Sequence, residues 1–172
     1  MPLPPIHGLI GLLPYFRNRK LDPLALVVGA TFVDLESLVY IVLGNPLDHQ
    51  FFHGYLLVFT VYTILVGLFV YFMERGFERK IWSIYTALRF NPTQVKYAPV
   101  TIYLCCFAGG LSHLLFDMWT HRSLPYIIYP LTYGNPFYIG QYTGIIELTA
   151  IGLALVTIYL WWKTKSRPQS SK

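Results

Sequence analysis

The chain has 172 residues, of which 55% are hydrophobic and only 12% are Asp, Glu, Lys or Arg. A soluble domain carries roughly 25% charged residues, so the composition argues against a soluble globular domain and against disorder, and indicates an integral membrane protein. The formal net charge is +5. Because most basic residues lie between apolar runs, membrane orientation explains this charge better than nucleic-acid binding, and we expect no nucleic-acid partner.

The predicted elements begin with a proline-interrupted apolar segment, PLPPIHGLIGLLPYF, which is too short to cross a bilayer and is expected to be interfacial or re-entrant. Four longer runs, each near the ~20 apolar residues of a transmembrane helix, cover residues 24–44, 55–73, 98–120 and 143–162. The basic, partly amphipathic loop 74–97 is expected to form a helix on the anionic inner leaflet. The sequence therefore predicts an all-α polytopic membrane bundle, with one domain over 1–162 and a polar tail at 163–172.

The positive charges predict an orientation. Four spans would place the N-terminal segment, the loop 74–97 and the tail on one side of the membrane, and these three segments hold 12 of the 13 Lys and Arg residues. The positive-inside rule then puts both termini in the cytoplasm, with the cell membrane as the expected location. The loops 45–54 and 121–142 would face outward.

Ionisable side chains inside the apolar runs are the informative residues. Asp34 and Glu36 lie in the first run, and His113 and Asp117 lie in the third. A charge at the bilayer centre costs at least ~2.5–3.5 kcal/mol, so such residues usually face the bundle interior and mark a site. Asp34 and Glu36 are two residues apart, which separates them by about 200° on a regular helix. Only one of them can face a common centre unless the helix is broken.

Histidines recur at helical spacing around these acids. His113, Asp117 and His121 are each four residues apart and share one helix face. His49 and His53 are also four apart, in the loop expected on the same side of the membrane. Imidazole and carboxylate groups are ligands of divalent metals, zinc above all. The pattern thus predicts a metal centre, with Glu36 or Asp34 as a candidate general base.

Five short motifs follow one another in an order that resembles a known family. They read Pro-x-x-His-Gly, Gly-x-x-x-x-Asp-x-Glu, His-x-x-x-His-Gly, Gly-Gly-x-Ser-His-x-x-x-Asp and Asn-Pro, at residues 4–8, 29–36, 49–54, 109–117 and 135–136. The pattern resembles the predicted membrane-bound metal-dependent hydrolases related to the bacterial LexA-regulated member. This resemblance implies a helical membrane hydrolase with a His/Asp metal centre. The ligands that it implies are His7, Asp34, Glu36, His49, His53, His113 and Asp117.

The sequence departs from that family at two motifs. An element that is often Asp-x-Asp reads Asp34-Leu35-Glu36, and the histidine loop lacks an Arg and a Ser that are expected to help bind phosphate. The positive-inside orientation also leaves His7 on the inner side. His7 can join the other histidines only if the N-terminal segment dips deep into the bilayer.

Three functional hypotheses follow. The first is a metal-dependent hydrolase in which a metal-activated water attacks a lipid or lipid-linked phosphoester or ester. The second is a transporter or ion-handling protein in which buried Asp, Glu and His residues carry protons or a cation. The third is a non-catalytic scaffold in which the polar groups only join helices. Membrane lipid is the expected partner in each case, and homo-oligomerisation is left open.

Overall fold

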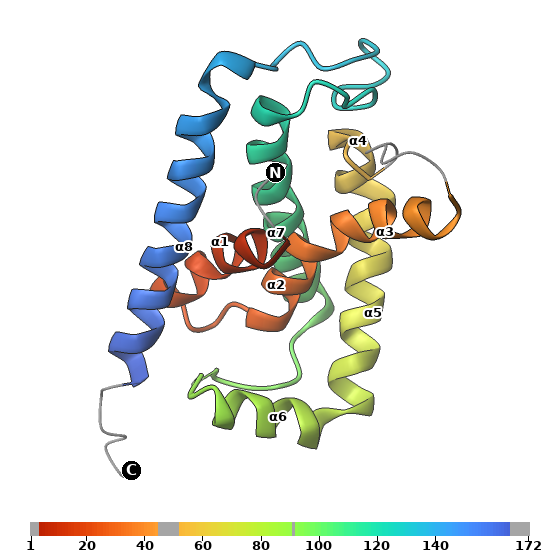
Figure 1. The fold of residues 1–172 in the computed structure, drawn as a ribbon. Coiled ribbons are helices and arrows are strands. Elements are labelled where there is room, and N and C mark those ends of the chain that lie inside the picture. Colours follow the sequence, from red (N-terminus) through yellow and green to blue (C-terminus); the bar gives the residue numbers. More distant parts are fainter. Residues whose placement is uncertain (1–3, 45–51, 91, 166–172) are drawn as a thin grey trace.

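The computed structural model describes residues 4–44, 52–90 and 92–165, and this part of the chain is helical with no strands (Figure 1). Three of its helices are long and apolar enough to cross a membrane: Tyr55–Gly76, Pro99–Thr120 and Gly140–Thr164. A helix of 22 residues is about 33 Å long, which matches the ~30 Å hydrocarbon core of a bilayer. The prediction of an all-helical membrane protein is confirmed at this level.

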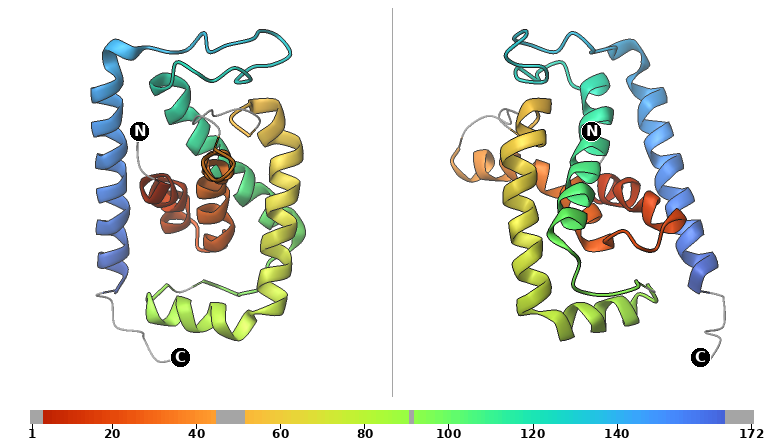
Figure 2. Two further views of the ribbon diagram at one scale, coloured as in Figure 1. Left: turned by 45° about the vertical axis from the view of Figure 1, so that its right-hand side comes forward. Right: turned by 180° about the vertical axis from the view of Figure 1, so that it is seen from behind.

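These three helices correspond to the predicted runs 55–73, 98–120 and 143–162. The first consists of α4 (Tyr55–Leu57), a π-helical turn η2 (Val58–Tyr62) and α5 (Thr63–Gly76). The second is α7 (Pro99–Thr120), and the third is a 3₁₀ turn η3 (Gly140–Tyr142) followed by α8 (Thr143–Lys165). Figure 2 shows α8 and α5 standing on opposite sides of the molecule, with α1 (Pro4–Arg17), α2 (Pro23–Thr31) and α7 between them.

The fourth predicted run, 24–44, is not one continuous helix. It is divided into α2 (Pro23–Thr31), a 3₁₀ turn η1 (Phe32–Asp34) and α3 (Leu35–Val42). The α3 helix turns away from α2 and points across the direction of the long helices (Figure 1). The break falls at Asp34, the ionisable residue in the middle of the run. A buried carboxylate needs polar partners, and the tighter turn directs it toward partners that a straight helix would not reach.

Two short helices lie across the long ones. The first, α1 (Pro4–Arg17), passes between α8 and α2 at some distance from either end of the long helices (Figures 1 and 2). The second, α6 (Glu78–Ala87), lies where α5 ends and has Ile81 and Tyr85 buried on its inner face. The N-terminal segment and part of the loop 74–97 are therefore helical, and both helices run across the bundle.

The segments that are rich in Lys and Arg meet at one end of the bundle. The Arg19 side chain, from the turn after α1, donates a hydrogen bond to Thr164 Oγ1 near the end of α8 at 2.9 Å. The Trp161 indole, also in α8, donates to the Leu88 carbonyl after α6 at 2.7 Å. The loop 121–139 lies at the opposite end (Figure 1). The basic segments are thus neighbours in space, as the charge count requires.

Glycines bring α2 and α7 into backbone contact. A Cβ atom placed on Gly29 would lie 2.4 Å from the Cys106 carbonyl oxygen, and one on Gly109 would lie 2.4 Å from the Leu26 carbonyl oxygen. Side chains at these positions would force the helices apart. Tyr62 fixes α2 from the other side, because its hydroxyl donates to the Gly29 carbonyl at 2.7 Å. This close packing sets the position of η1 relative to the second half of α7.

Candidate metal centre

Four side chains from three separate segments converge inside the bundle. Their potential ligand atoms all lie within 4.8 Å of one another. We call them the His/Asp cluster: Asp34 from η1, His53 from the segment before α4, and His113 and Asp117 from α7. Two of the predicted ligands are thus on one helix, and the other two reach them from distant parts of the sequence.

The distances within the His/Asp cluster suit a single ion. His113 Nε2 lies 3.0 Å from Asp117 Oδ2 and 3.4 Å from Asp34 Oδ1. His53 Nε2 lies 3.6 Å from Asp117 Oδ2 and 3.8 Å from Asp34 Oδ1. Two atoms bound to one tetrahedral zinc ion, each about 2.0–2.1 Å from the metal, lie about 3.3 Å apart. The cluster therefore needs only small side-chain movements to surround an ion.

The break at η1 lets Asp34 and Glu36 act on the same histidine. Asp34 lies beside His53 Nε2, whereas Glu36 Oε2 lies 3.5 Å from His53 Nδ1. The Phe52 peptide N–H also donates to Glu36 Oε2 at 2.9 Å. On a straight helix the two acids would point in nearly opposite directions. Glu36 therefore lies behind His53, on the far side of its ring from the cluster.

Hydrogen bonds fix which nitrogen each imidazole presents. His113 Nδ1 donates to the Ala30 carbonyl at 2.9 Å, because a carbonyl oxygen can only accept. This leaves the lone pair of His113 Nε2 facing Asp34 and Asp117. Glu36 favours a proton on Nδ1 of His53 in the same way. Metal-binding histidines usually have such a carbonyl or carboxylate partner on the other ring nitrogen.

The cluster is buried and attracts positive charge. His53 and His113 are fully buried and Asp117 is 2% exposed, whereas the Asp34 side chain is 16% exposed. His113 Nε2 and Asp117 Oδ1 have no hydrogen-bond partner within the described part of the chain. Buried polar atoms are rarely left in this state. Burial acts to lower the pKa of His53, but hydrogen bonds to Asp34 and Glu36 outweigh it and raise the pKa to about 9.

Two further histidines lie beside the cluster. His7 Nε2 is 3.5 Å from Asp117 Oδ1, and the His7 ring stacks on the His113 ring with 4.0 Å between centroids. His121 Nδ1 is 3.7 Å from the same Asp117 oxygen. Burial and the neighbouring His113 lower the pKa of His7 to about 4, so its imidazole is neutral at pH 7. His49 lies outside the described residues.

The structure shows whether His7 lies near the other predicted ligands. The N-terminal segment was expected to carry His7 on the inner side unless it dips into the bilayer. In the structure α1 crosses the bundle and places His7 in its interior with only 2% exposure (Figure 1). Every predicted ligand in the described part of the chain therefore lies in the cluster, next to it, or, like Glu36, behind one of its members.

Several supporting groups were not identified from the sequence. The Ala30 carbonyl belongs to the backbone, so no motif of side-chain types could identify it. Asn135, known only as half of an Asn-Pro pair, closes the end of α7, because its side-chain amide donates to the Met118 and His121 carbonyls at 2.6 and 2.7 Å. Gly54 is required for close approach, since a Cβ there would lie 2.5 Å from the Tyr126 carbonyl oxygen. Asn135 and Gly54 belong to motifs identified in the sequence, but their structural roles were not predicted.

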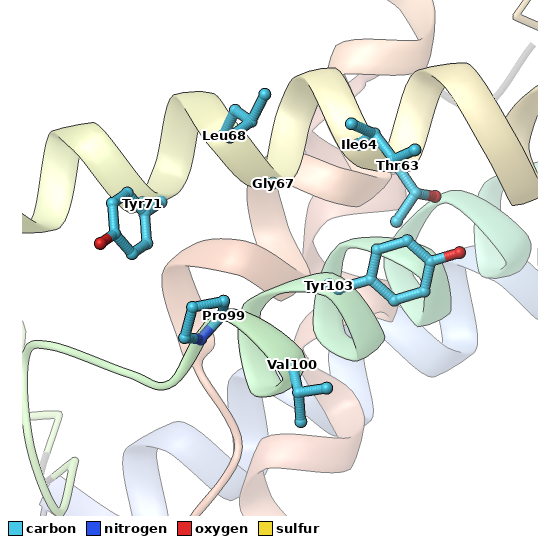
Figure 3. A pocket seen from close by; sticks show the side chains of 8 residues that line it. All are labelled: Thr63, Ile64, Gly67, Leu68, Tyr71, Pro99, Val100 and Tyr103. Carbon is cyan, nitrogen blue, oxygen red and sulfur yellow. The ribbon is translucent and has the colours of Figure 1, made fainter.

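An apolar groove of about 430 Å³ lies between α5 and α7, away from the cluster (Figure 3). Tyr103, the groove residue nearest to His113 along α7, precedes it by ten residues, or about 15 Å of helix. The groove is therefore not the entrance to the cluster, and its composition suits contact with acyl chains. The residues that line it are Thr63, Ile64, Gly67, Leu68, Tyr71, Pro99, Val100 and Tyr103.

Comparison with known proteins gives a family. The family model described as Domain of unknown function (DUF4184) matches residues 1–172. The chain belongs to this family. No curated protein and no solved structure matches the chain. The family description names no activity, so the chemistry of the site has to be argued from its residues.

Proposed function

We propose that the chain is an integral membrane hydrolase that uses a divalent metal ion bound by the His/Asp cluster. The observation that carries this proposal is the convergence of two imidazole nitrogens and two carboxylate oxygens in a buried site, with Ala30 and Glu36 orienting the imidazoles from behind. This donor set fits Zn²⁺, which accepts both ligand types in tetrahedral geometry. The buried, unsatisfied atoms of His113 and Asp117 are then explained as ligand atoms.

A divalent ion held by His53, His113 and Asp117 would keep its fourth position for a water, lower the pKa of that water to about 7 and so supply a nucleophile at neutral pH. The protein contributes ligand geometry and a proton acceptor. Asp34 is the best-placed acceptor, because it is the least buried member of the cluster. Glu36 already accepts from the Phe52 N–H and faces His53. We therefore assign Glu36 to positioning His53, and Asp34, which lies beside both cluster histidines, to accepting the proton of the water.

The surroundings of Asp34 favour a lipid substrate. The α3 helix starts directly after Asp34 and exposes Leu35, Val39 and Val42 by 42%, 56% and 86%. In a membrane these side chains contact acyl chains, so a lipid lying along α3 brings its headgroup to the most open side of the cluster. A lipid or lipid-linked phosphoester, or an ester of similar size, is the substrate class that this arrangement supports.

We further propose that the chain crosses the cell membrane four times, with both termini in the cytoplasm. Asp22 lies near the basic end of the bundle, where its N–H contacts Cys105 in the first half of α7. Tyr55 lies near the other end, where its N–H donates to the Ile127 carbonyl at 2.9 Å. Asp22 and Tyr55, which flank the fourth predicted run, thus lie near opposite ends of the bundle, and this supports a fourth crossing that is broken at η1. On this proposal α1 is re-entrant, α6 lies on the inner leaflet, and the cluster is nearer the outer face.

The test is to purify the protein in lipid nanodiscs, measure bound metal by mass spectrometry, and assay phospholipids and lipid-linked phosphoesters. We expect stoichiometric metal and metal-dependent hydrolysis, both lost in His113→Ala and Asp117→Ala. Glu74→Gln, a change at a buried acid elsewhere in the bundle, is the control and should keep both. A protein without stoichiometric metal whose properties survive these alanine changes would contradict the proposal. Ion flux in proteoliposomes without hydrolysis would favour an ion-handling protein instead.

A further inference from the structure

The two oxygens of Asp117 face different sets of imidazoles. Oδ2 lies within 3.6 Å of His53 and His113, which belong to the His/Asp cluster. Oδ1 faces the other way, 3.5 Å from His7 Nε2 and 3.7 Å from His121 Nδ1. His121 Nδ1 also lies 2.9 Å from Thr120 Oγ1 and 3.3 Å from the Asp117 carbonyl oxygen, so it must lose a proton and these contacts to bind an ion. We propose that Asp117 bridges two divalent cations: the first in the His/Asp cluster, and a second held by Oδ1 together with His7 and His121. This inference deepens the proposed function and rests on it for the first ion.

Burial favours a ligand role for His7 over a packing role. His7 and Asp117 are each only 2% exposed, and the nearby Asp117 Oδ1 and His7 Nδ1 form no hydrogen bonds with the described residues. A leucine or isoleucine at position 7 would fill space in α1 without burying unsatisfied nitrogen. A cation on the Oδ1 side satisfies this buried carboxylate oxygen and takes as a ligand His7 Nε2, which lies 3.5 Å from it.

The stacking of His7 on His113 fits two adjacent ions. The two rings lie 4.0 Å apart at their centroids and are tilted by 32°. Their Nε2 atoms face different oxygens of Asp117, at 3.5 and 3.0 Å. In two-metal hydrolytic sites the ions lie about 3.5–4 Å apart, so ligands of neighbouring ions stand side by side in this way. A single ion in the cluster gives this second imidazole no ligand role.

A second cation also narrows the substrate class. Two ions bridged by a carboxylate stabilise both the attacking and the leaving oxygen of an in-line displacement at phosphorus. The proposed site therefore favours a phosphoester over a carboxylic ester. Charge supports the same choice, because a second divalent cation makes the site a better binder of a phosphate headgroup.

The test is a titration of the metal-free protein in nanodiscs with Co²⁺, followed by absorption spectroscopy and by metal analysis after removal of loosely bound ion. Two variants address the second site. His7→Gln keeps a neutral N–H donor of similar length beside Asp117 but is a poor zinc or cobalt ligand. His121→Ala removes the partly exposed ligand at the end of α7, where folding is least at risk. Tyr15→Phe, which changes a buried residue of α1 that packs on Phe90, is the control.

We expect two ions per chain in the unchanged protein and in Tyr15→Phe, and one tightly bound ion in His7→Gln and in His121→Ala. One ion in the unchanged protein, or two ions in both histidine variants, would overturn the second site. The outcomes also separate the two proposals. If the protein binds one ion and hydrolyses lipid, the second site is wrong and the proposed function stands. If it binds two ions and hydrolyses no ester, the second site stands and the proposed function is wrong.

Discussion

The bundle holds buried carboxylates at two places that invite comparison. One is the His/Asp cluster. The other is a carboxyl pair, Asp22 before α2 and Glu74 in α5, near the basic end of the bundle, in which both residues are 0% exposed. Among the residues that the structure describes, Asp22 Oδ2 and Glu74 Oε1 lack a hydrogen-bond partner, as does Asp117 Oδ1 in the cluster. Burial of acids alone therefore does not distinguish the two places.

The neighbours of the acids do distinguish them. Asp22 Oδ1 accepts from the Leu24 and Ala25 N–H groups at 2.9 and 3.1 Å and so caps α2, while Glu74 Oε2 accepts from the Tyr97 N–H at 2.9 Å. Burial also raises the pKa of Asp22, which favours a proton held between the two carboxyls. Asp34 and Asp117 instead face imidazole nitrogens. The comparison teaches that imidazoles beside the acids, and not buried charge as such, distinguish the candidate metal centre.

The largest expected difference between the cluster and the carboxyl pair is tested by replacing one acid in each with its amide. Asp117→Asn should weaken metal binding by more than 100-fold and abolish hydrolysis, because it removes the carboxylate that every histidine of the centre faces. Glu74→Gln should leave metal affinity unchanged. Competition with a metal-sensitive dye measures both affinities. Equal losses in the two variants would show that the bundle depends on buried charge in general.

A smaller effect is expected at Glu36. Glu36→Ala removes Oε2, the oxygen that accepts from the Phe52 N–H and faces His53 Nδ1, so nothing in its place favours a proton on that nitrogen. Loss of such an outer partner typically costs 10–100-fold in metal affinity. The check is to measure metal affinity and kcat in the same preparation. A fall in kcat with unchanged metal affinity would instead assign Glu36 as the general base.

The pH dependence of metal binding should be smaller still, about tenfold per pH unit at most. His53 has a pKa of about 9 in the metal-free protein, so it is protonated at pH 7.5 and must lose its proton to bind a metal. Affinity should therefore rise from pH 6.5 to pH 9 and level off above. Calorimetry in buffers of different ionisation enthalpy should show about one proton released at pH 7.5. Binding without proton release would exclude His53 from the ligand set.

The smallest expected effect is at the carboxyl pair. The folded-state pKa of Asp22 is raised above its unfolded value, so this residue destabilises the fold as pH rises above about 4. Asp22→Asn removes this pH-dependent destabilisation and keeps an oxygen that can cap α2. We expect Tm to rise by about 2–4 °C at pH 7.5, with the gain shrinking as the pH is lowered toward 4. Thermal unfolding followed by tryptophan fluorescence measures the change, and a lower Tm would show that the ionised carboxylate is needed.

The lengths of the apolar runs in the sequence predicted most of the fold. The runs 55–73, 98–120 and 143–162 appear as long helices because about 20 apolar residues in lipid have few alternatives to an α-helix. The run 24–44 met the same criterion, yet its helix is broken at η1. Composition could not show this, because the break depends on Asp34 meeting His113 and His53, which are distant in sequence.

The candidate site was predictable in its residue types and only partly in its roles. The four-residue spacing of His113 and Asp117 places both on one face of α7, and the structure brings them within 3.0 Å. The two-residue spacing of Asp34 and Glu36 left open which acid faces the centre, and tertiary contacts decide that Asp34 does. The Ala30 carbonyl could not be predicted, since it depends on α2 packing against α7 through glycine.

The ligands of the centre are spread over most of the chain, from His7 in α1 to His121 after α7. During synthesis the N-terminal helices leave the ribosome long before α7 does. A metal ion can therefore be fully coordinated only after the later helices have entered the bilayer. On the proposed function, metal loading is thus a late step of biogenesis, because a chain truncated before α7 lacks His113 and Asp117.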